Sequence, residues 1–169
     1  MVERAMKTPS IERLSELFTI DPETGLLSHK TPARKHAVGE EAGYLNSIGY
    51  RQVAFDGKIY SVHRIAWALY YGEQPKGEID HINGDRSDNR KGNLRLATSA
   101  QNNQNRRLSA RNKTGIKGVF RVKRGKPWRV AVGFGRGSYY ITQFDCFGQA
   151  VKHANEIRSR LHRQFARAA

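Results

Sequence analysis

The sequence predicts an α+β fold: a strand–loop–strand–helix core, preceded by a small β-rich segment and followed by a three-stranded antiparallel sheet with one packed helix. Alternating apolar residues and helical apolar spacing both occur, in separate stretches of the chain. Hydrophobic residues make up only 38% of the 169 residues, which is few for one large core. We therefore expect small cores joined by exposed segments, in three parts that span residues 1–74, 75–108 and 109–169.

The first part, residues 1–74, is expected to form a helix, a β-hairpin and a second helix. Thr8-Pro9-Ser10 is typical of a helix start, and Asp21–Gly25 is typical of a turn. Asp56-Gly57 lies between two strand-like runs and is a strong hairpin signal. Helical spacing follows from Ile65, and Gly72 is expected to end that helix.

The middle part, residues 75–108, predicts the order strand, loop, strand, helix. Ile79–Ile82 and Leu94–Ala97 are the two strand candidates, and residues 83–92 form a polar loop between them. Thr98 and Gln101 form a capping-box signature at the start of a helix that is expected to reach about Arg107.

The last part, residues 109–169, begins with a basic linker and then predicts three strands and a helix. The strand candidates are Gly118–Lys123, Trp128–Phe134 and Tyr139–Phe144. Asp145 is positioned to cap a final helix in which apolar residues recur from Ala150 to Phe165.

The middle part concentrates residues suited to metal-assisted hydrolysis. Asp80 and His81 are adjacent on a strand, where neighbours normally point to opposite faces, but a bulge or a strand end can direct both toward one ion. Carboxylate and amide oxygens suit Mg²⁺ or Mn²⁺, and imidazole suits proton removal from water near neutral pH. Polar loops are also rich in Asn and Asp for turn formation alone. Spacing by itself therefore leaves both interpretations open.

The run D-H-I-N-G-D-x-S-D-N-R-x-x-N-L-R-L-A-T-x-x-Q-N-N-Q-N, which starts at Asp80, closely resembles the HNH homing endonucleases of bacteriophages and self-splicing introns. The sub-type has Asn in place of the last His, with one Asn 12 positions after the His81 equivalent and another 21 positions after it, here Asn93 and Asn102. Val62-His63-Arg64 also resembles the segment that precedes the motif. The resemblance covers about residues 44–107.

This resemblance implies a ββα-metal (His-Me finger) nuclease core and a metal-dependent endonuclease that hydrolyses phosphodiester bonds in DNA, by nicking or by double-strand cleavage. Asp80 and Asn102 would bind one divalent cation, Mg²⁺ or Mn²⁺, that contacts the scissile phosphate. His81 would be the general base, and Asn93 would hold the His81 ring or its loop. Two neighbours on the same helix remain rival ligands for Asn102: Asn103 and Asn105.

A second resemblance concerns the last part. Thr114–Val119, Trp128–Ala131 and Phe144-Asp145 resemble the DNA-binding domain of the APETALA/ethylene-response-factor class, over about residues 114–165. That family places a three-stranded sheet in the major groove, with a helix behind it. The expected DNA contacts are Arg121, Lys123, Arg124, Lys126 and Arg129.

The face of the first of these strands is left open by the sequence. Strict alternation puts Phe120 and Val122 on the inner face, whereas the register of the family puts Val119 and Arg121 there.

Charge is distributed unevenly along the chain. Residues 1–75 carry 9 Lys and Arg against 9 Asp and Glu, so the whole net charge of +15 lies in residues 76–169. Ten basic residues and no acidic one occur from Arg106 to Arg129. Such a field attracts polyanions. We expect double-stranded DNA as the partner; RNA or an anionic membrane are the weaker alternatives.

The remaining composition narrows the class of protein. Cys146 is the only cysteine, which excludes an internal disulfide and a cysteine-based zinc cluster. Met1–Ser10 lacks an apolar signal core, and no stretch approaches the length of a membrane span. We expect a cytoplasmic protein, in a bacterial host cell if it is phage-encoded, without a membrane partner; a monomer is favoured.

Two functions follow from these patterns. The leading one is a phage-type homing endonuclease or a less selective nickase, and the alternative is a DNA-binding regulator with a degenerate nuclease site. The intact set Asp80, His81, Asn93 and Asn102 favours the enzyme. Because residues 109–169 contain none of these groups, we expect a fragment of residues 1–108 to nick DNA still, at high protein concentration.

Overall fold

The computed structural model describes residues 9–32, 36–106, 108–109, 111–135 and 137–165. The chain forms two compact units, Met1–Leu96 and Ala97–Ala169. The hairpin region shares the first unit with the predicted strands of the middle part, whereas the helix after Thr98 lies in the second unit. A fragment that ends at residue 108 would therefore separate this helix from the rest of its unit.

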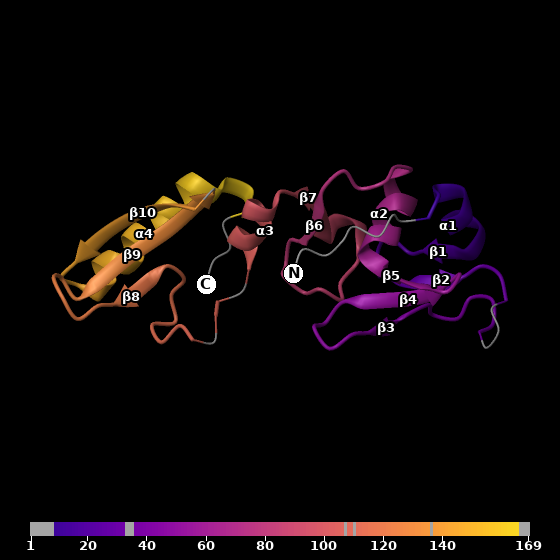
Figure 1. Ribbon diagram of the computed structural model, residues 1–169, viewed down its shortest axis with the longest axis horizontal. Helices are drawn as coiled ribbons and strands as arrows, with labels where there is room; N and C mark the ends of the chain where they lie inside the picture. The colour runs from indigo at the N-terminus through magenta and orange to yellow at the C-terminus, as the bar shows by residue number, and fades with distance from the viewer. Residues whose placement is uncertain (1–8, 33–35, 107, 110, 136, 166–169) are drawn as a thin grey trace. The chain divides into compact units, whose positions relative to one another are not determined.

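The first unit is built from short strands around one long helix (Figure 1). Strands β1 and β2 form an antiparallel pair, β3, β4 and β5 form an antiparallel sheet in that order, and β6 and β7 form a two-stranded sheet. The elements are α1 (Ile11–Leu17), β1 (Phe18–Ile20), β2 (Leu27–His29), β3 (Tyr44–Leu45), β4 (Arg51–Phe55), β5 (Lys58–Ser61), α2 (Val62–Tyr71), β6 (Glu78–His81), the short 3-10 helix η1 (Lys91–Asn93) and β7 (Leu94–Ala97), whose last residue belongs to the second unit.

Local sequence explains where these elements begin and end, as predicted. The Ser10 hydroxyl accepts a hydrogen bond from the Arg13 amide and caps α1. Asp56 and Gly57 have φ values of 48° and 70°, and positive φ at both positions is what a tight hairpin turn between β4 and β5 requires. Helix α2 ends at Gly72, whose φ of 65° is the left-handed conformation common after helices.

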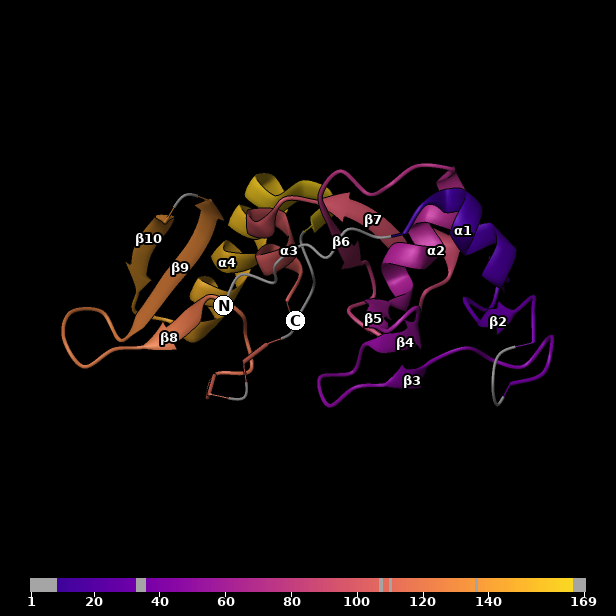
Figure 2. The same ribbon diagram turned by 45° about the vertical axis from the view of Figure 1, so that its right-hand side comes forward.

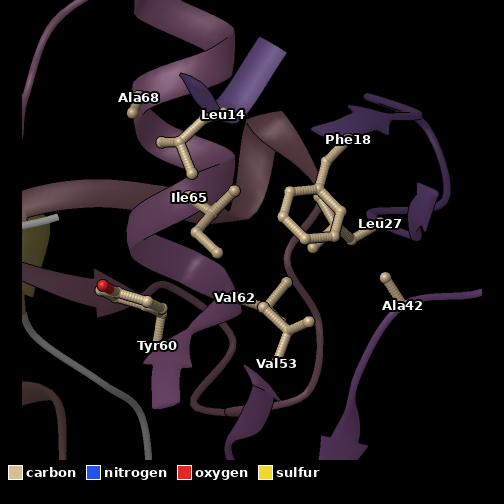
Figure 3. Packing of buried hydrophobic residues seen from close by; sticks show 9 residues of the cluster. All are labelled: Leu14, Phe18, Leu27, Ala42, Val53, Tyr60, Val62, Ile65 and Ala68. Atoms are coloured by element: carbon tan, nitrogen blue, oxygen red, sulfur yellow. The ribbon is translucent and has the colours of Figure 1, made fainter. Parts of the chain in front are cut away.

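Two apolar clusters place α2 at the centre of the first unit. On one side it packs on α1 and the strands, and Figure 3 shows Ile65 and Val62 of α2 directed toward this cluster, which comprises Leu14, Phe18, Leu27, Ala42, Val53, Tyr60, Val62, Ile65 and Ala68. On the other side, Ala66 and Trp67 pack against Ile79 of β6 and Leu94 of β7. Helix α2 therefore joins the hairpin sheet to the β6–β7 sheet within the first unit.

The second unit contains the predicted three-stranded antiparallel sheet, in the order β10–β9–β8, with helix α4 against it (Figure 2). Its core includes a cluster of buried residues from the sheet and α4: Val119, Val130, Val132, Ala150, Ala154 and Ile157. The elements are α3 (Ser99–Asn105), β8 (Val119–Arg121), β9 (Trp128–Gly135), β10 (Ser138–Phe144), α4 (Phe147–His162) and the 3-10 helix η2 (Arg163–Phe165).

Two expectations for this unit were wrong, and a third falls in part outside the described residues. Strict alternation in β8 was wrong: Phe120 is 45% exposed, whereas Val119 is fully buried, as the family register implied. Arg121, which that register also put on the inner face, is exposed. Asp145 does not cap α4, since the N-cap residue is Cys146 without a side-chain bond, and Asp145 instead pairs with Lys126. Helix α3 ends at Asn105, and Arg107 lies outside the described residues.

Across the described ranges, none of the helices has the length and apolar character needed to cross a membrane.

Candidate active site

The end of strand β6 carries the two residues that the sequence singles out for chemistry. Asp80 and His81 are each only 4% exposed. The preceding residue, Ile79, anchors the strand in the cluster beneath α2, and β7 pairs alongside. Neighbouring side chains of a strand leave on opposite faces, so Asp80 and His81 have different surroundings.

Asp80 is paired with an arginine of the neighbouring strand. Arg95 of β7 donates from Nε and from an Nη nitrogen to the same carboxylate oxygen, Oδ2, at 2.8 and 2.7 Å. The Arg95 side chain is 16% exposed and that of Asp80 is 4% exposed. A buried carboxylate requires such a counter-charge, because an unpaired buried charge costs several kcal/mol.

His81 has its orientation set by Asn89, which is 1% exposed. The Asn89 amide nitrogen donates to the Ser87 carbonyl at 3.2 Å, so its Oδ1 faces His81 Nε2, at 3.3 Å. An amide oxygen only accepts, so in neutral His81 the proton lies on Nε2 and the lone pair lies on Nδ1. Burial lowers the pKa of His81 below its ordinary value. The ring is therefore neutral near pH 7 and has a basic Nδ1 atom.

Two aromatic rings surround His81. The ring centroids of His63 and Tyr50 lie 5.4 and 5.9 Å from that of His81. Burial lowers the pKa of His63 to about 3, with a smaller contribution from the nearby His81, so His63 stays neutral. The guanidinium of Arg86, an exposed residue of the loop, lies 4.9 Å from the centre of the Tyr50 ring. The candidate base His81 thus packs beside two aromatic rings, of which that of His63 is uncharged.

Asn93 holds the loop of residues 83–92 in place. Its Oδ1 accepts from the Asn83 amide at 3.0 Å, and its Nδ2 donates to the Asp88 carbonyl at 2.8 Å. The sequence left open whether Asn93 holds the His81 ring or its loop; the described contacts of its side chain are to the loop, and the ring contact comes from Asn89.

The loop is also supported from the N-terminal region. The Tyr70 hydroxyl on α2 donates toward the carbonyls of Asp21 and Asn89, at 3.2 and 3.1 Å. Gly25, in the turn after β1, lies so close to the loop backbone that a Cβ atom there would be 2.4 Å from the backbone nitrogen of Arg90. The first part of the chain therefore fixes the backbone that presents Asn89 to His81.

Asn102 lies on α3, in the second unit. The predicted capping box is present: the Thr98 hydroxyl accepts from the Gln101 amide, and the Gln101 side chain accepts from the Thr98 amide. At the other end, Lys117 Nζ donates to the carbonyls of Gln104 and Arg106, at 2.7 and 2.6 Å. Asn102 is half-buried, Asn103 is exposed and Asn105 is 4% exposed.

The donor types present suit a hard divalent cation. Within the described part of the chain, no group of three or more His, Cys, Asp or Glu is arranged to hold a metal. A site of the predicted kind needs only one carboxylate and one amide oxygen from the protein, with the rest supplied by water and phosphate. Asp80 and Asn102 supply those atoms in type, although Arg95 already occupies Oδ2 of Asp80.

Comparison with known proteins connects this geometry to a family. Residues 60–104, from the end of β5 through most of α3, match a family model described as HNH endonuclease. Protein 3.8 of Escherichia phage T7 is 33% identical over 106 residues, which cover 62% of this chain and 87% of protein 3.8. The chain belongs to the family of phage T7 protein 3.8. It contains an HNH endonuclease domain at residues 60–104. No solved structure matches the chain significantly.

Two residues of the HNH domain were missed by sequence reasoning, Asn89 and Arg95. Asn89 stands in a segment where Asn and Asp are expected for turn formation, so its composition gave no signal. Arg95 had a usable signal: it lies on the strand expected to pair with that of Asp80, and opposite charges on paired strands attract.

The five residues expected to contact DNA lie outside the HNH domain and form two groups. Arg129 is exposed on the sheet face opposite α4, where the strand register aligns it with Phe120 and Gln143. The others are exposed at the end of β8 or in the turn to β9: Arg121, Lys123, Arg124 and Lys126. Lys126 pairs with Asp145 at 2.9 Å, and both side chains are exposed, so this ion pair is weak.

Proposed function

We propose that this protein is a metal-dependent DNA endonuclease that hydrolyses phosphodiester bonds with His81 as its general base. The observation that carries the proposal is the buried pair Asp80–His81 at the end of β6, with His81 held by Asn89 in the tautomer that has its lone pair on Nδ1. An HNH endonuclease domain covers both residues. A degenerate site in a DNA-binding regulator would have no reason to keep this arrangement.

His81 Nδ1 takes the proton from the attacking water. Since burial lowers the pKa of His81, the ring is neutral near pH 7 and available to accept that proton. Asn89 accepts the Nε2 hydrogen and keeps it on that nitrogen while Nδ1 becomes protonated. Asn93 holds the loop that carries Asn89, and so acts as a positioning residue.

Asp80 and Asn102 would hold one divalent cation, Mg²⁺ or Mn²⁺. Both offer hard oxygen atoms, which these ions prefer. Bound there, the ion would stabilise the negative charge that develops on the scissile phosphate and the leaving 3′-oxygen. Lys117 and the Thr98–Gln101 capping box fix α3, and thereby the direction of the Asn102 side chain.

Double-stranded DNA is the substrate class that the charge supports. The whole excess of +15 lies in residues 76–169, and Arg121, Lys123, Arg124 and Arg129 are exposed there. Arg129 on the open sheet face is the best placed of the predicted set to reach base edges, and the turn residues would contact phosphates. We propose a homing endonuclease or nickase of phage type; kinship with a phage T7 protein supports a phage origin.

Supercoiled plasmid DNA provides the direct test. The full-length protein is incubated with plasmid and either Mg²⁺ or Mn²⁺, and the products are separated on a gel. We expect nicked or linear DNA with metal and none in excess EDTA. Binding without cleavage under all metal conditions would favour the regulator, and full cleavage in EDTA would exclude the one-metal mechanism.

A further inference from the structure

We propose that Arg95 is a built-in competitor of the divalent cation at Asp80, and that it couples metal binding to DNA binding. The inference rests on the proposed metal site. It assigns to Arg95 the role of keeping the metal affinity of the free protein low, so that the cation binds firmly only together with a DNA phosphate.

The geometry of the pair carries this inference. Two nitrogens of the Arg95 guanidinium donate to one oxygen, Asp80 Oδ2, at 2.8 and 2.7 Å, and both side chains are largely buried. Burial makes the attraction stronger than it would be in water and makes an unpaired Asp80 costly. Arg95 also lies on β7, the direct partner of the strand that carries Asp80, so the pair is held by the sheet itself.

A divalent ion that binds Asp80 therefore meets a fixed positive charge. Arg95 cannot lose its charge, because guanidinium stays protonated at all ordinary pH values. Ion and guanidinium repel each other across a partly buried site, or the ion must displace a bidentate contact. Either way the free protein loses affinity for the ion.

A DNA phosphate at the site offsets this loss of affinity for the ion. A phosphate that reaches the site adds negative charge, which is shared by the ion and the guanidinium. Binding of DNA then raises the affinity for the ion, and by thermodynamic linkage the ion raises the affinity for DNA by the same factor. Arg95 thus keeps metal binding weak, and prevents metal-assisted chemistry, in the absence of DNA.

The first experiment measures Mn²⁺ binding to the full-length protein without DNA, from the EPR signal of free Mn²⁺. Arg95→Gln removes the charge and keeps an N–H donor for Asp80, and Arg95→Met removes both. We expect Mn²⁺ to bind about tenfold or more tightly to Arg95→Gln than to the parent protein. The repulsion between the ion and a unit positive charge a few ångströms away in a partly buried site is large enough to account for a change of that size. If Arg95→Met does not fold, the Mn²⁺ affinity of Arg95→Gln alone tests the inference.

Arg90→Gln is the matched control. Arg90 lies in the same unit, makes an ion pair with Asp88 at 2.7 Å, and is 54% exposed, so the variant makes the same change of net charge. Its pair is screened by water, and we expect Mn²⁺ affinity to change by less than about twofold. An equal gain in Arg90→Gln and Arg95→Gln would mean that general charge, rather than the Arg95–Asp80 contact, is responsible, and would overturn the inference.

The second experiment adds a short DNA duplex in a His81→Ala background, where cleavage does not intervene. We expect the duplex to raise Mn²⁺ affinity strongly when Arg95 is present and much less when Arg95→Gln is added. Equal enhancement with and without Arg95 would contradict the coupling role.

The outcomes separate this inference from the proposed function. Mn²⁺ affinity that is unchanged or weaker in Arg95→Gln overturns the competitor role but leaves a metal site that Asp80→Asn abolishes. If Asp80→Asn leaves Mn²⁺ binding unchanged in every background, the proposed metal ligand itself is wrong, and the inference falls with it.

Discussion

At the scale of single residues, the protonation pattern of His81 depends on an uncharged neighbour. Asn89 has its amide direction fixed by the Ser87 carbonyl, its backbone held by Tyr70, and its Oδ1 directed at His81 Nε2. The hydrogen bond that the Asn89 amide donates to the Ser87 carbonyl thereby decides which nitrogen of His81 carries the proton.

Asn89→Leu should therefore impair catalysis more than substrate binding. We expect the single-turnover cleavage rate to fall by about tenfold or more. This is part of the ~10²- to 10⁴-fold rate acceleration that a general base contributes. Asn89→Asp, which keeps an acceptor for Nε2–H, should retain more activity. The nitrogen-15 NMR signals of His81 above its pKa should report the Nε2–H tautomer in the parent protein and a mixture in Asn89→Leu. An unchanged tautomer together with a reduced rate would reject the positioning role.

The lowered pKa of His81 predicts the pH dependence of the rate. A general base works only when neutral, so cleavage should rise with pH through the pKa of His81 and then level off. Burial puts that pKa below 6.5, and a bound divalent cation shifts it in the same direction. The logarithm of the single-turnover rate, measured from pH 4.5 to 8 at saturating metal, should therefore bend below pH 6.5. A bend above pH 7 would point to another group as the base.

At the scale of elements, α3 shows how a short polar helix can be held. It has 7 residues and the sequence SAQNNQN, which provides no apolar stripe. A capping box satisfies its first turn, and the Lys117 ammonium binds the carbonyls at its end, where a positive charge is favourable.

Lys117→Met should loosen α3 and leave DNA affinity nearly intact. Loss of hydrogen bonds to a charged donor costs about 1.5–3 kcal/mol each at most, so the thermal midpoint of unfolding should fall by several degrees. Mn²⁺ affinity in the presence of DNA should fall too, if Asn102 is a ligand. Lys123→Met serves as the control: Lys123 is exposed, and its loss should reduce DNA affinity instead. Equal effects of the two variants on DNA affinity would contradict the assignment of Lys117.

The boundaries of elements were predictable because their causes are local. The Asp56-Gly57 turn, the Gly72 stop and the Thr98 cap depend on residues within four positions of each other, and each occurs as predicted. The prediction for Asp145 failed because its side chain pairs with Lys126, which lies between β8 and β9, and Cys146 is the N-cap residue of α4.

Contacts of the candidate site were less predictable because they join distant segments. The motif indicated Asp80, His81 and Asn93, and these lie together in the first unit. The Arg95–Asp80 pair depends on strand register, and the Asn89–His81 contact depends on the path of a loop that is braced by Tyr70 and Gly25. Such contacts follow from tertiary packing, about which single-residue patterns carry little information.

At the scale of the whole molecule, charge and chemistry are separated along the chain. The first 75 residues are neutral, and the excess of +15 lies in the remainder. Because α3 packs within the second unit, removal of residues 109–169 would disturb the helix that carries Asn102 as well as the basic surface. We therefore expect the 1–108 fragment to be inactive, contrary to the expectation from sequence, and charge substitutions are the cleaner probe of DNA binding.

The triple variant Lys123→Gln/Arg124→Gln/Arg129→Gln should bind DNA more weakly and with less dependence on salt. Removal of each phosphate interaction should reduce the slope of log affinity against log salt concentration by about 0.9. Binding to a labelled duplex between 50 and 300 mM salt, in EDTA, measures this slope. A slope equal to that of the parent protein would show that these residues, all exposed, do not contact DNA.

The central claim is that His81 is the general base of a metal-dependent nuclease, and His81→Ala tests it most directly. Single-turnover cleavage of a plasmid with Mg²⁺ is measured for both proteins, with DNA affinity measured in parallel. We predict a loss of cleavage of about 10²-fold or more at nearly unchanged DNA affinity, because a general base accelerates the reaction and adds little to phosphate binding. Cleavage by His81→Ala at close to the parent rate would contradict the account.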